Sequence, residues 1–182
     1  MNRVGVVAGL QREADSFRRG ETASGHAAPR VDVLVCGIGP DRAARAARRL
    51  FERGAGALIS WGFAGGLSPE LLPGDAVIPS AVMDPQGRRF EADPTWRGHL
   101  LARLGMPTED GPGMTLATTS MPLTSAAAKR SYHLHSGAEA VDMESAAVAA
   151  VAAEAGLPFL AIRAICDSVT EDLPPAALAS IG

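Results

Sequence analysis

The sequence predicts an α/β protein, a three-layer sandwich built around a mixed, largely parallel central sheet. Short apolar runs recur along the 182 residues, each ends in glycine or a polar residue, and segments with helical spacing separate several of them. Strands that are apolar throughout are typical of parallel sheets covered by helices on both faces. With 47% hydrophobic residues, the chain 1–182 is expected to fold as a single domain.

The elements follow from these patterns in chain order. The expected strands are residues 4–9, 31–39, 56–66, 74–82 and 158–167, and the expected helices are the stretch after the first strand, 41–54 and 140–156. In "GIGP", Gly37 and Gly39 provide a tight turn that lets a helix begin at Pro40. The segment 84–113 is rich in proline, glycine and charge, and we expect it to be an irregular surface excursion.

Composition argues against several classes of partner and location. A net charge of −3 and a pI near 5.8 give no reason to expect nucleic acid as a partner. The first apolar run is too short for a signal peptide, and no segment is long enough to span a bilayer. Cys36 and Cys166 lie in apolar runs, so we expect reduced thiols and a cytoplasmic protein. Tyr132, His133 and His135 lack metal-ligand spacing, and no metal is expected.

One carboxylate stands out within the expected helix "AVDMESAAVAAVAAEAG". Glu144 shares a face with Val148 and Val151, where a carboxylate is costly unless something hydrogen-bonds it. Glu13 follows the first strand and Asp167 ends the last, so three carboxylates are expected near one crevice beyond the strand ends. Each one alone is more often solvated or caps a helix.

Two further patterns have simpler explanations. "GIGPDR" lacks the third glycine of a dinucleotide fingerprint, because Arg42 stands there, and a nicotinamide cofactor is not expected. Arg42, Arg45 and Arg49 fall on one helical face, and a solvated surface is the favoured interpretation. The alternative is attraction to anionic lipid headgroups, which would bring peripheral membrane contact.

Four motifs occur in order along the chain: "GLQREA", "SWGFAGGLSPELLPGDAVIP", "AVDMESAAVA" and "RAICDSV". Together they resemble the nucleoside phosphorylase and nucleosidase superfamily, which includes the methylthioadenosine nucleosidases. Within it, "CDSVTEDLPPAAL" is most similar to the hopanoid-associated phosphorylases. The resemblance implies an enzyme that cleaves the N-glycosidic bond of a purine nucleoside. The expected reaction releases adenine from a 5′-substituted adenosine, with adenosylhopane of hopanoid biosynthesis as the expected substrate.

The resemblance also implies roles for particular residues. Cleavage passes through an oxocarbenium-like sugar and needs an acid for the departing base. Asp167 would protonate or hydrogen-bond the purine N7, Glu144 would accept hydrogen bonds from the ribose hydroxyls, and Met143 would pack on the sugar. Glu13 is placed as the general base that activates water. The other substrate-binding residues implied by the resemblance are Phe63, Gly65, Leu123 and Cys166.

The nucleophile separates two reactions. Phosphorylases carry arginine and serine anchors at positions that here hold Glu13 and Phe63, so hydrolysis without a cofactor is favoured. An inward-pointing Arg12 would restore phosphorolysis, with phosphate as co-substrate. A methylthioadenosine/S-adenosylhomocysteine-type nucleosidase and a non-catalytic purine-binding module of the same fold stay open as alternatives.

The chain departs from these relatives in two places. Between "DAVIP" and "MTLATTS" it is shorter, which would leave the 5′ side of the pocket open. Phe90, Trp96, Leu100 and Leu101 are then expected to offer apolar surface to a long hydrocarbon, so the nucleoside substrate could be lipid-linked. The chain ends at Gly182, where relatives continue into a terminal helix, and the domain is expected to be C-terminally short. The resemblance further implies a homodimer.

Overall fold

The computed structural model describes residues 3–23, 30–107 and 113–174. The strands in this part of the chain are β1 (Arg3–Ala8), β2 (Arg30–Val35), β3 (Leu58–Gly66), β4 (Ala76–Val77), β5 (Ala81–Met83), β6 (Arg89–Glu91), β7 (Thr115–Thr118), β8 (Ala140–Asp142) and β9 (Phe159–Asp167). The helices are α1 (Gln11–Ala23), α2 (Pro40–Glu52), α3 (Pro94–Leu104), α4 (Ala126–Ser136) and α5 (Ser145–Glu154).

The strands form one mixed sheet in the order β2-β1-β3-β8-β7-β5-β6, while β9 pairs with β3 and β4. Five of the strand pairs are parallel, including β1 with β2, β1 with β3, and β3 with β9. The three antiparallel pairs are β3 with β8, β4 with β9, and β5 with β6. The predicted mixed, largely parallel sheet is therefore confirmed.

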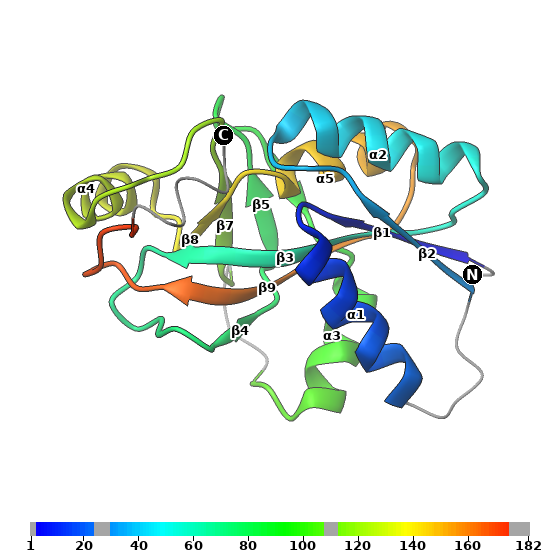
Figure 1. Cartoon of the computed structure of the whole chain (residues 1–182), viewed down its shortest axis with the longest axis horizontal. Coiled ribbons are helices and arrows are strands. Elements are labelled where there is room, and N and C mark those ends of the chain that lie inside the picture. Colours follow the sequence, from blue (N-terminus) through cyan, green and yellow to red (C-terminus); the bar gives the residue numbers. More distant parts are fainter. Residues whose placement is uncertain (1–2, 24–29, 108–112, 175–182) are drawn as a thin grey trace.

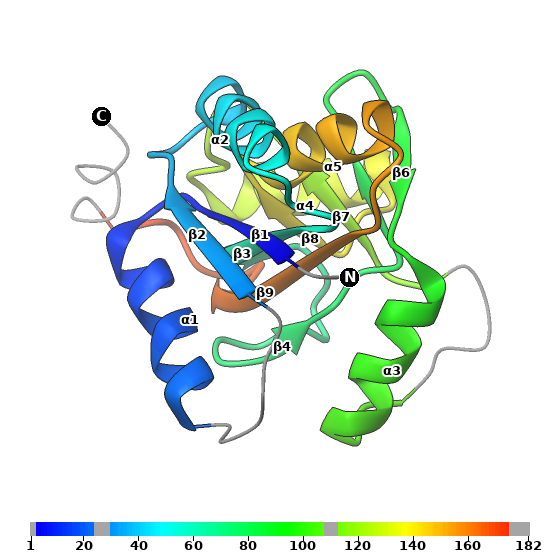
Figure 2. The same cartoon turned by 90° about the vertical axis from the view of Figure 1, so that its right-hand side faces the viewer.

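Helices cover both faces of the sheet, which gives the three expected layers (Figures 1 and 2). In Figure 2, α2 and α5 lie above the sheet, and α1 and α3 lie below it. Small side chains allow α2 and α5 to approach closely: Ala43 and Ala47 of α2 are buried, as are Ala149 and Ala152 of α5. This rigid layer backs the strands whose ends carry the candidate site.

The turn before α2 forms as the sequence predicts. Gly37 and Gly39 have φ angles of 79° and 110°, a region that residues with a Cβ rarely enter. Helix α2 then begins at Pro40, whose fixed φ suits the first helical position. The strand before this turn ends at Val35 and not at residue 39, since the two glycines already belong to the turn.

The expected helix 140–156 is wrong in its first part. Residues 140–142 form β8, which pairs with β3 on one side and β7 on the other, and α5 begins only at Ser145. A short apolar run that is buried on both sides has no periodicity that separates a strand from a helix. Glu144 therefore lies at the junction, with non-helical φ and ψ of −131° and −36°.

The segment 84–113 is more ordered than expected, because it contains β6 and α3. The Asp93 side chain accepts a hydrogen bond from the Trp96 N–H at 2.8 Å and caps α3, Pro94 occupies its first turn, and Gly105 ends it with φ 65°. The predicted strand 74–82 is also divided, into β4 and β5.

No helix in the described part of the chain is long and apolar enough to cross a membrane. The predicted C-terminal shortening concerns residues 175–182, which lie outside the described ranges.

Candidate active site

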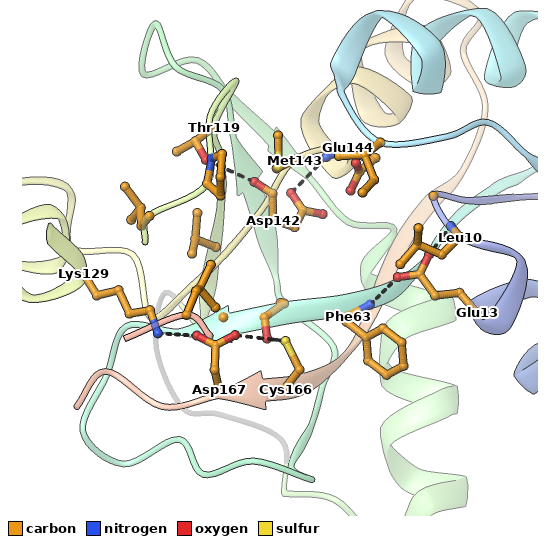
Figure 3. A pocket seen from close by; sticks show the side chains of 18 of the residues that line it. Leu10, Glu13, Phe63, Thr119, Lys129, Asp142, Met143, Glu144, Cys166 and Asp167 are labelled. Atoms are coloured by element: carbon orange, nitrogen blue, oxygen red, sulfur yellow. Dashed lines mark hydrogen bonds and ion pairs between the residues drawn. The ribbon is translucent and has the colours of Figure 1, made fainter. Parts of the chain in front are cut away.

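A cavity of about 170 Å³ opens where β1, β3 and β9 end and β8 meets α5 (Figure 3). It is lined by all eight residues selected from the sequence: Glu13, Phe63, Gly65, Leu123, Met143, Glu144, Cys166 and Asp167. They come from separate segments of the chain, which only the sheet order brings together. Apolar atoms make up most of its wall, and the carboxylates lie at distinct places along it.

Two main-chain N–H groups fix the carboxylate of Glu13. The N–H of Leu10 donates to Oε2 at 2.7 Å, and the N–H of Phe63 donates to Oε1 at 2.9 Å. Glu13 is only 6% exposed, so this oxygen pair is held at the edge of the cavity with little freedom. The sequence places Glu13 here because α1 starts directly after β1.

Gly62 makes room for this arrangement. A Cβ at Gly62 would lie 2.5 Å from Glu13 Oε1 and 2.6 Å from Arg163 Nη1, far inside van der Waals contact. Glu13 and Arg163 therefore approach the same point on β3. Gly62 of "SWGFAGG" is therefore required because the side chains of Glu13 and Arg163 approach it closely. Its backbone conformation is that of an ordinary strand.

Glu144 reaches across the junction to the turn before α2. The N–H of Gly39 donates to Glu144 Oε1 at 2.8 Å, so the "GIGP" turn holds an internal carboxylate. Burial, followed by the charge of Asp142, raises the pKa of Glu144 to about 7, while Arg163 and the Gly39 N–H oppose this rise. Close to neutral pH, this group exchanges readily between its charged and neutral forms.

A buried polar network supports the cavity from below. Arg163 donates from Nε and Nη2 to Asp142 Oδ2 at 2.9 and 2.6 Å, and Nη2 also donates to Ser60 Oγ at 2.7 Å. Thr118 Oγ1 donates to the other Asp142 oxygen at 2.6 Å. Asp142 thus ties β7, β8 and β9 together immediately before Met143 and Glu144. A paired, fully hydrogen-bonded network of this kind fixes the orientation of these two site residues.

Asp167 lies at the opposite end of the cavity from Glu13 (Figure 3). A bulge in β9 turns its side chain: Ala64 pairs with Ile165, but Gly65 pairs with Asp167, so Cys166 is the extra residue. Lys129 Nζ donates to Asp167 Oδ2, and Cys166 Sγ donates to Oδ1 at 3.0 Å. Burial and the neighbouring Asp167 raise the pKa of the Cys166 thiol to about 12, which keeps this sulfur protonated.

The sequence profile of the Phosphorylase superfamily matches residues 7–178 of this chain. The chain belongs to this superfamily. The 5′-methylthioadenosine/S-adenosylhomocysteine nucleosidase of Mycobacterium tuberculosis is 29% identical over 188 residues, which cover 80% of this chain and 72% of the relative.

Solved structures share the fold. The same kind of nucleosidase from Neisseria meningitidis, in complex with methylthio-immucillin-A, is 25% identical with a TM-score of 0.78, and covers 100% of this chain and 90% of the other. Futalosine hydrolase of Helicobacter pylori is 17% identical with a TM-score of 0.81, and covers 99% and 89%. The superfamily resemblance seen in the motifs and the fold class predicted from the apolar runs are both confirmed.

The superfamily motifs did not lead us to three residues at this site. Arg163 stands in "RAICD" and Asp142 in "VDME", where each could be taken as a surface charge or a strand end. Lys129 lies in a helix that was not predicted. One signal was available, because Lys129 is the only lysine in a chain that otherwise uses arginine.

The expected apolar surface for a 5′ group is wrong. Trp96 packs against the buried cluster formed by Val4, Val6 and Ile59, Phe90 packs against the main core, and Leu101 is 2% exposed. These side chains, and Leu100, are absent from the cavity wall. The reason is that Trp96, Leu100 and Leu101 belong to α3, which lies below the sheet in Figure 2, and that Phe90 belongs to β6.

Arg12, which the sequence left open, does reach the cavity. Its guanidinium lies 5.4 Å from the centre of the Phe63 ring, which is 36% exposed. Such a cation–π contact holds the ring at the mouth of the cavity. Among the described residues, no group of three or more His, Cys, Asp or Glu side chains converges as a metal site would require.

Proposed function

We propose that this member of the phosphorylase superfamily hydrolyses the N-glycosidic bond of a purine nucleoside, and that it releases adenine from an adenosine with an apolar 5′ substituent. One observation carries the proposal: a single cavity holds a separate carboxylate for each task, with Asp167 for the base, Glu144 for the ribose and Glu13 for the nucleophile. The nucleosidase activity of the Mycobacterium tuberculosis relative supports it.

The sheet order gives the direction in which the substrate lies. From one edge inward, the strands run β2, β1, β3, with β9 beside β3. A purine beside Asp167 at the end of β9 puts its ribose over the end of β3, between Glu13 and Glu144. As the bond from C1′ to N9 breaks, Glu144 holds the ribose hydroxyls and Asp167 hydrogen-bonds N7 of the departing base. Glu13 takes a proton from the attacking water.

Charge favours water over phosphate as the nucleophile. The carboxylates of Glu13 and Glu144 both face the place where a nucleophile would approach C1′, and they would repel a phosphate dianion. Arg163, which approaches the same point on β3 as Glu13, already donates to Asp142 and Ser60. The turn at Gly39, which suits a phosphate by its geometry, already holds the Glu144 carboxylate.

The 5′ group then lies over β1 and β2. Leu10 follows β1, Ile38 follows β2, and both line the cavity, so this end is apolar. Since β2 is the edge strand, a long substituent can leave the cavity past it. These features support a 5′ group as large as that of adenosylhopane, and they equally accommodate the smaller group of 5′-methylthioadenosine.

Phosphorolysis is the second candidate, and Arg12 favours it because its guanidinium reaches the mouth of the cavity. Adenine release from adenosine, 5′-methylthioadenosine and an adenosine with a large 5′ hydrocarbon, each with and without phosphate, separates the two. We expect release without phosphate. Dependence on phosphate would establish the phosphorylase, and purine binding without release would indicate a non-catalytic module. Equal kcat/KM for the two 5′-substituted substrates would remove the hopanoid assignment.

Variants test the two catalytic assignments. Asp167→Asn and Glu13→Gln should each lower kcat on the order of 10²-fold or more. Glu52→Gln makes the same chemical change at an exposed position on α2, and it should leave kcat unchanged. If either site variant folds and turns over at the parental rate, that residue has no part in the reaction.

We further propose that the protein acts in the cytoplasm and forms a homodimer. Analytical sedimentation would test the oligomeric state. Arg42, Arg45 and Arg49 line a second hollow beside β2, on the side where a long 5′ substituent would emerge. This placement supports contact with anionic headgroups when the substrate is lipid-linked, and vesicle co-sedimentation with and without anionic lipid measures it.

A further inference from the structure

Lys129 is a fully buried cation that the mechanism above does not use. It is 1% exposed and belongs to the wall of the cavity. It is also the only lysine in the sequence, which contains sixteen arginines. Figure 3 shows its side chain extending from α4 to Asp167.

The ammonium group has one acceptor for each of its protons. Nζ donates to Asp167 Oδ2, to the carbonyl oxygen of Ser168 at 2.9 Å, and to that of Glu171 at 2.8 Å. A lysine ammonium has three N–H donors. If one proton moves to Asp167, the remaining amine keeps two N–H groups for the two carbonyls, and its lone pair faces the Asp167 O–H. Both states are fully hydrogen-bonded.

Arginine could not take both states. Its guanidinium stays protonated in proteins, while a buried lysine gives up its proton readily. An arginine at position 129 would still pair with the carboxylate, but it would hold its proton. Lysine is therefore the residue type that suits a site where a proton moves.

Asp167 lines the cavity, and its Oδ2 is paired with the Lys129 ammonium. Within the described part of the chain, the donor to its other oxygen is Cys166 Sγ, at 3.0 Å, and a thiol with a pKa of about 12 is a poor source of a proton. Gly65 keeps the carboxylate close to the sheet, since a Cβ there would lie 3.1 Å from Oδ2. Lys129 Nζ, in contrast, donates directly to Asp167 Oδ2.

We propose that Lys129 is a positioning residue that supplies, through Asp167, the proton taken up by N7 of the departing purine. The inference rests on the proposed function. As the bond from C1′ to N9 breaks, its electron pair moves into the purine ring, Lys129 passes a proton to Asp167, and Asp167 passes a proton to N7. The attacking water forms the new bond to C1′ and loses a proton to Glu13. The products are the free sugar and neutral purine, and exchange with solvent returns the proton from Glu13 to Lys129.

Two substrates and three variants test this. One substrate is the best adenine nucleoside, and the other is a riboside whose leaving group, 4-nitrophenolate, departs without a proton. Lys129→Arg should lower kcat for the adenine nucleoside on the order of 10²-fold and leave the nitrophenyl riboside near the parental rate. Lys129→Met, which removes the pairing as well, should impair both. Arg130→Met, at the exposed next position of α4, is the matched control and should impair neither.

The outcomes separate the inference from the proposed function. If the parent releases no base from purine nucleosides, the proposed function fails and the inference falls with it. If the parent is active and Lys129→Arg keeps its purine turnover, only the inference is overturned. An equal loss on both substrates in Lys129→Arg would also overturn it, because the residue would then be structural.

A second measurement needs no variant to fold. Isotope-labelled lysine gives one side-chain NMR signal, since the chain has one lysine. A complex with a C-nucleoside analogue of adenosine, which cannot be cleaved, should shift this signal, because N7 draws on the Lys129 proton through Asp167. The same analogue with carbon in place of N7 should shift it much less. Equal shifts with the two analogues would refute the proposal.

Discussion

Glu144→Gln is expected to make the ligand-free protein more stable at neutral and alkaline pH. The substitution keeps an acceptor oxygen for the Gly39 N–H and removes a charge that burial and Asp142 disfavour. The pKa of Glu144 is about 7, against an ordinary value of 4.5. Between these values the folded protein holds the proton more often than the unfolded chain does, so the free energy of unfolding of the parent falls as the pH rises from about 4.5 to 7.

The size of the effect follows from the two pKa values. At about 1.4 kcal/mol per pH unit, the parent loses roughly 3 kcal/mol across this range, and the variant does not. Denaturant unfolding at pH 5 and pH 8, without ligand, measures the difference. The free-energy advantage of Glu144→Gln should be small at pH 5 and approach this value at pH 8. If the difference in free energy of unfolding between Glu144→Gln and the parent were the same at pH 5 and pH 8, the reasoning would be refuted, because the pKa of Glu144 would then not be raised.

The same variant should lose function while it gains stability. An amide accepts more weakly than a carboxylate, so the variant should distinguish an adenine nucleoside from its 2′-deoxy analogue less well than the parent does. Undiminished discrimination would show that Glu144 does not hold the ribose. A gain in stability together with a loss in selectivity is expected of a charge that is kept for a ligand.

The remaining predictions concern the walls of the cavity. Gly62→Ala should lower kcat on the order of 10²-fold, because the new methyl group displaces the Glu13 carboxylate. Gly98→Ala is the control, since a Cβ there would meet nothing within 4 Å. Equal activity of the two variants would contradict the role of Glu13 as general base. Ile38→Ser should raise KM for 5′-methylthioadenosine roughly tenfold and change KM for adenosine much less, since about 1.4 kcal/mol of apolar contact is lost only for the larger group. Equal changes would remove Ile38 from the 5′ site.

Local chemistry made part of the fold predictable. The turn at Gly37 and Gly39 and the start of α2 at Pro40 depend on the conformations open to these residue types alone. The long apolar strands β3 and β9 are readable for the same reason, because each is buried along most of its length. The site carboxylates could be selected because each follows or ends a strand, or belongs to a motif shared with the superfamily.

Other features depended on contacts between distant segments. The three residues of β8 become a strand only because β3 and β7 lie on either side of them, and their sequence continues without interruption into α5. Helix α3 had readable signals at Asp93 and Gly105, but the surrounding proline, glycine and charge outweighed them. Its burial against the sheet decides which side its apolar residues face.

By itself, the sequence determined the α/β class and the superfamily and singled out three carboxylates that line the cavity, since local patterns and motifs carry this information. Only the tertiary structure decided what surrounds each carboxylate. Gly39 is 105 residues from Glu144, and Lys129 is 38 residues from Asp167, so neither pairing has a local signature. The state of a buried carboxylate is set by the few groups within hydrogen-bonding distance, and the folded chain alone chooses those groups.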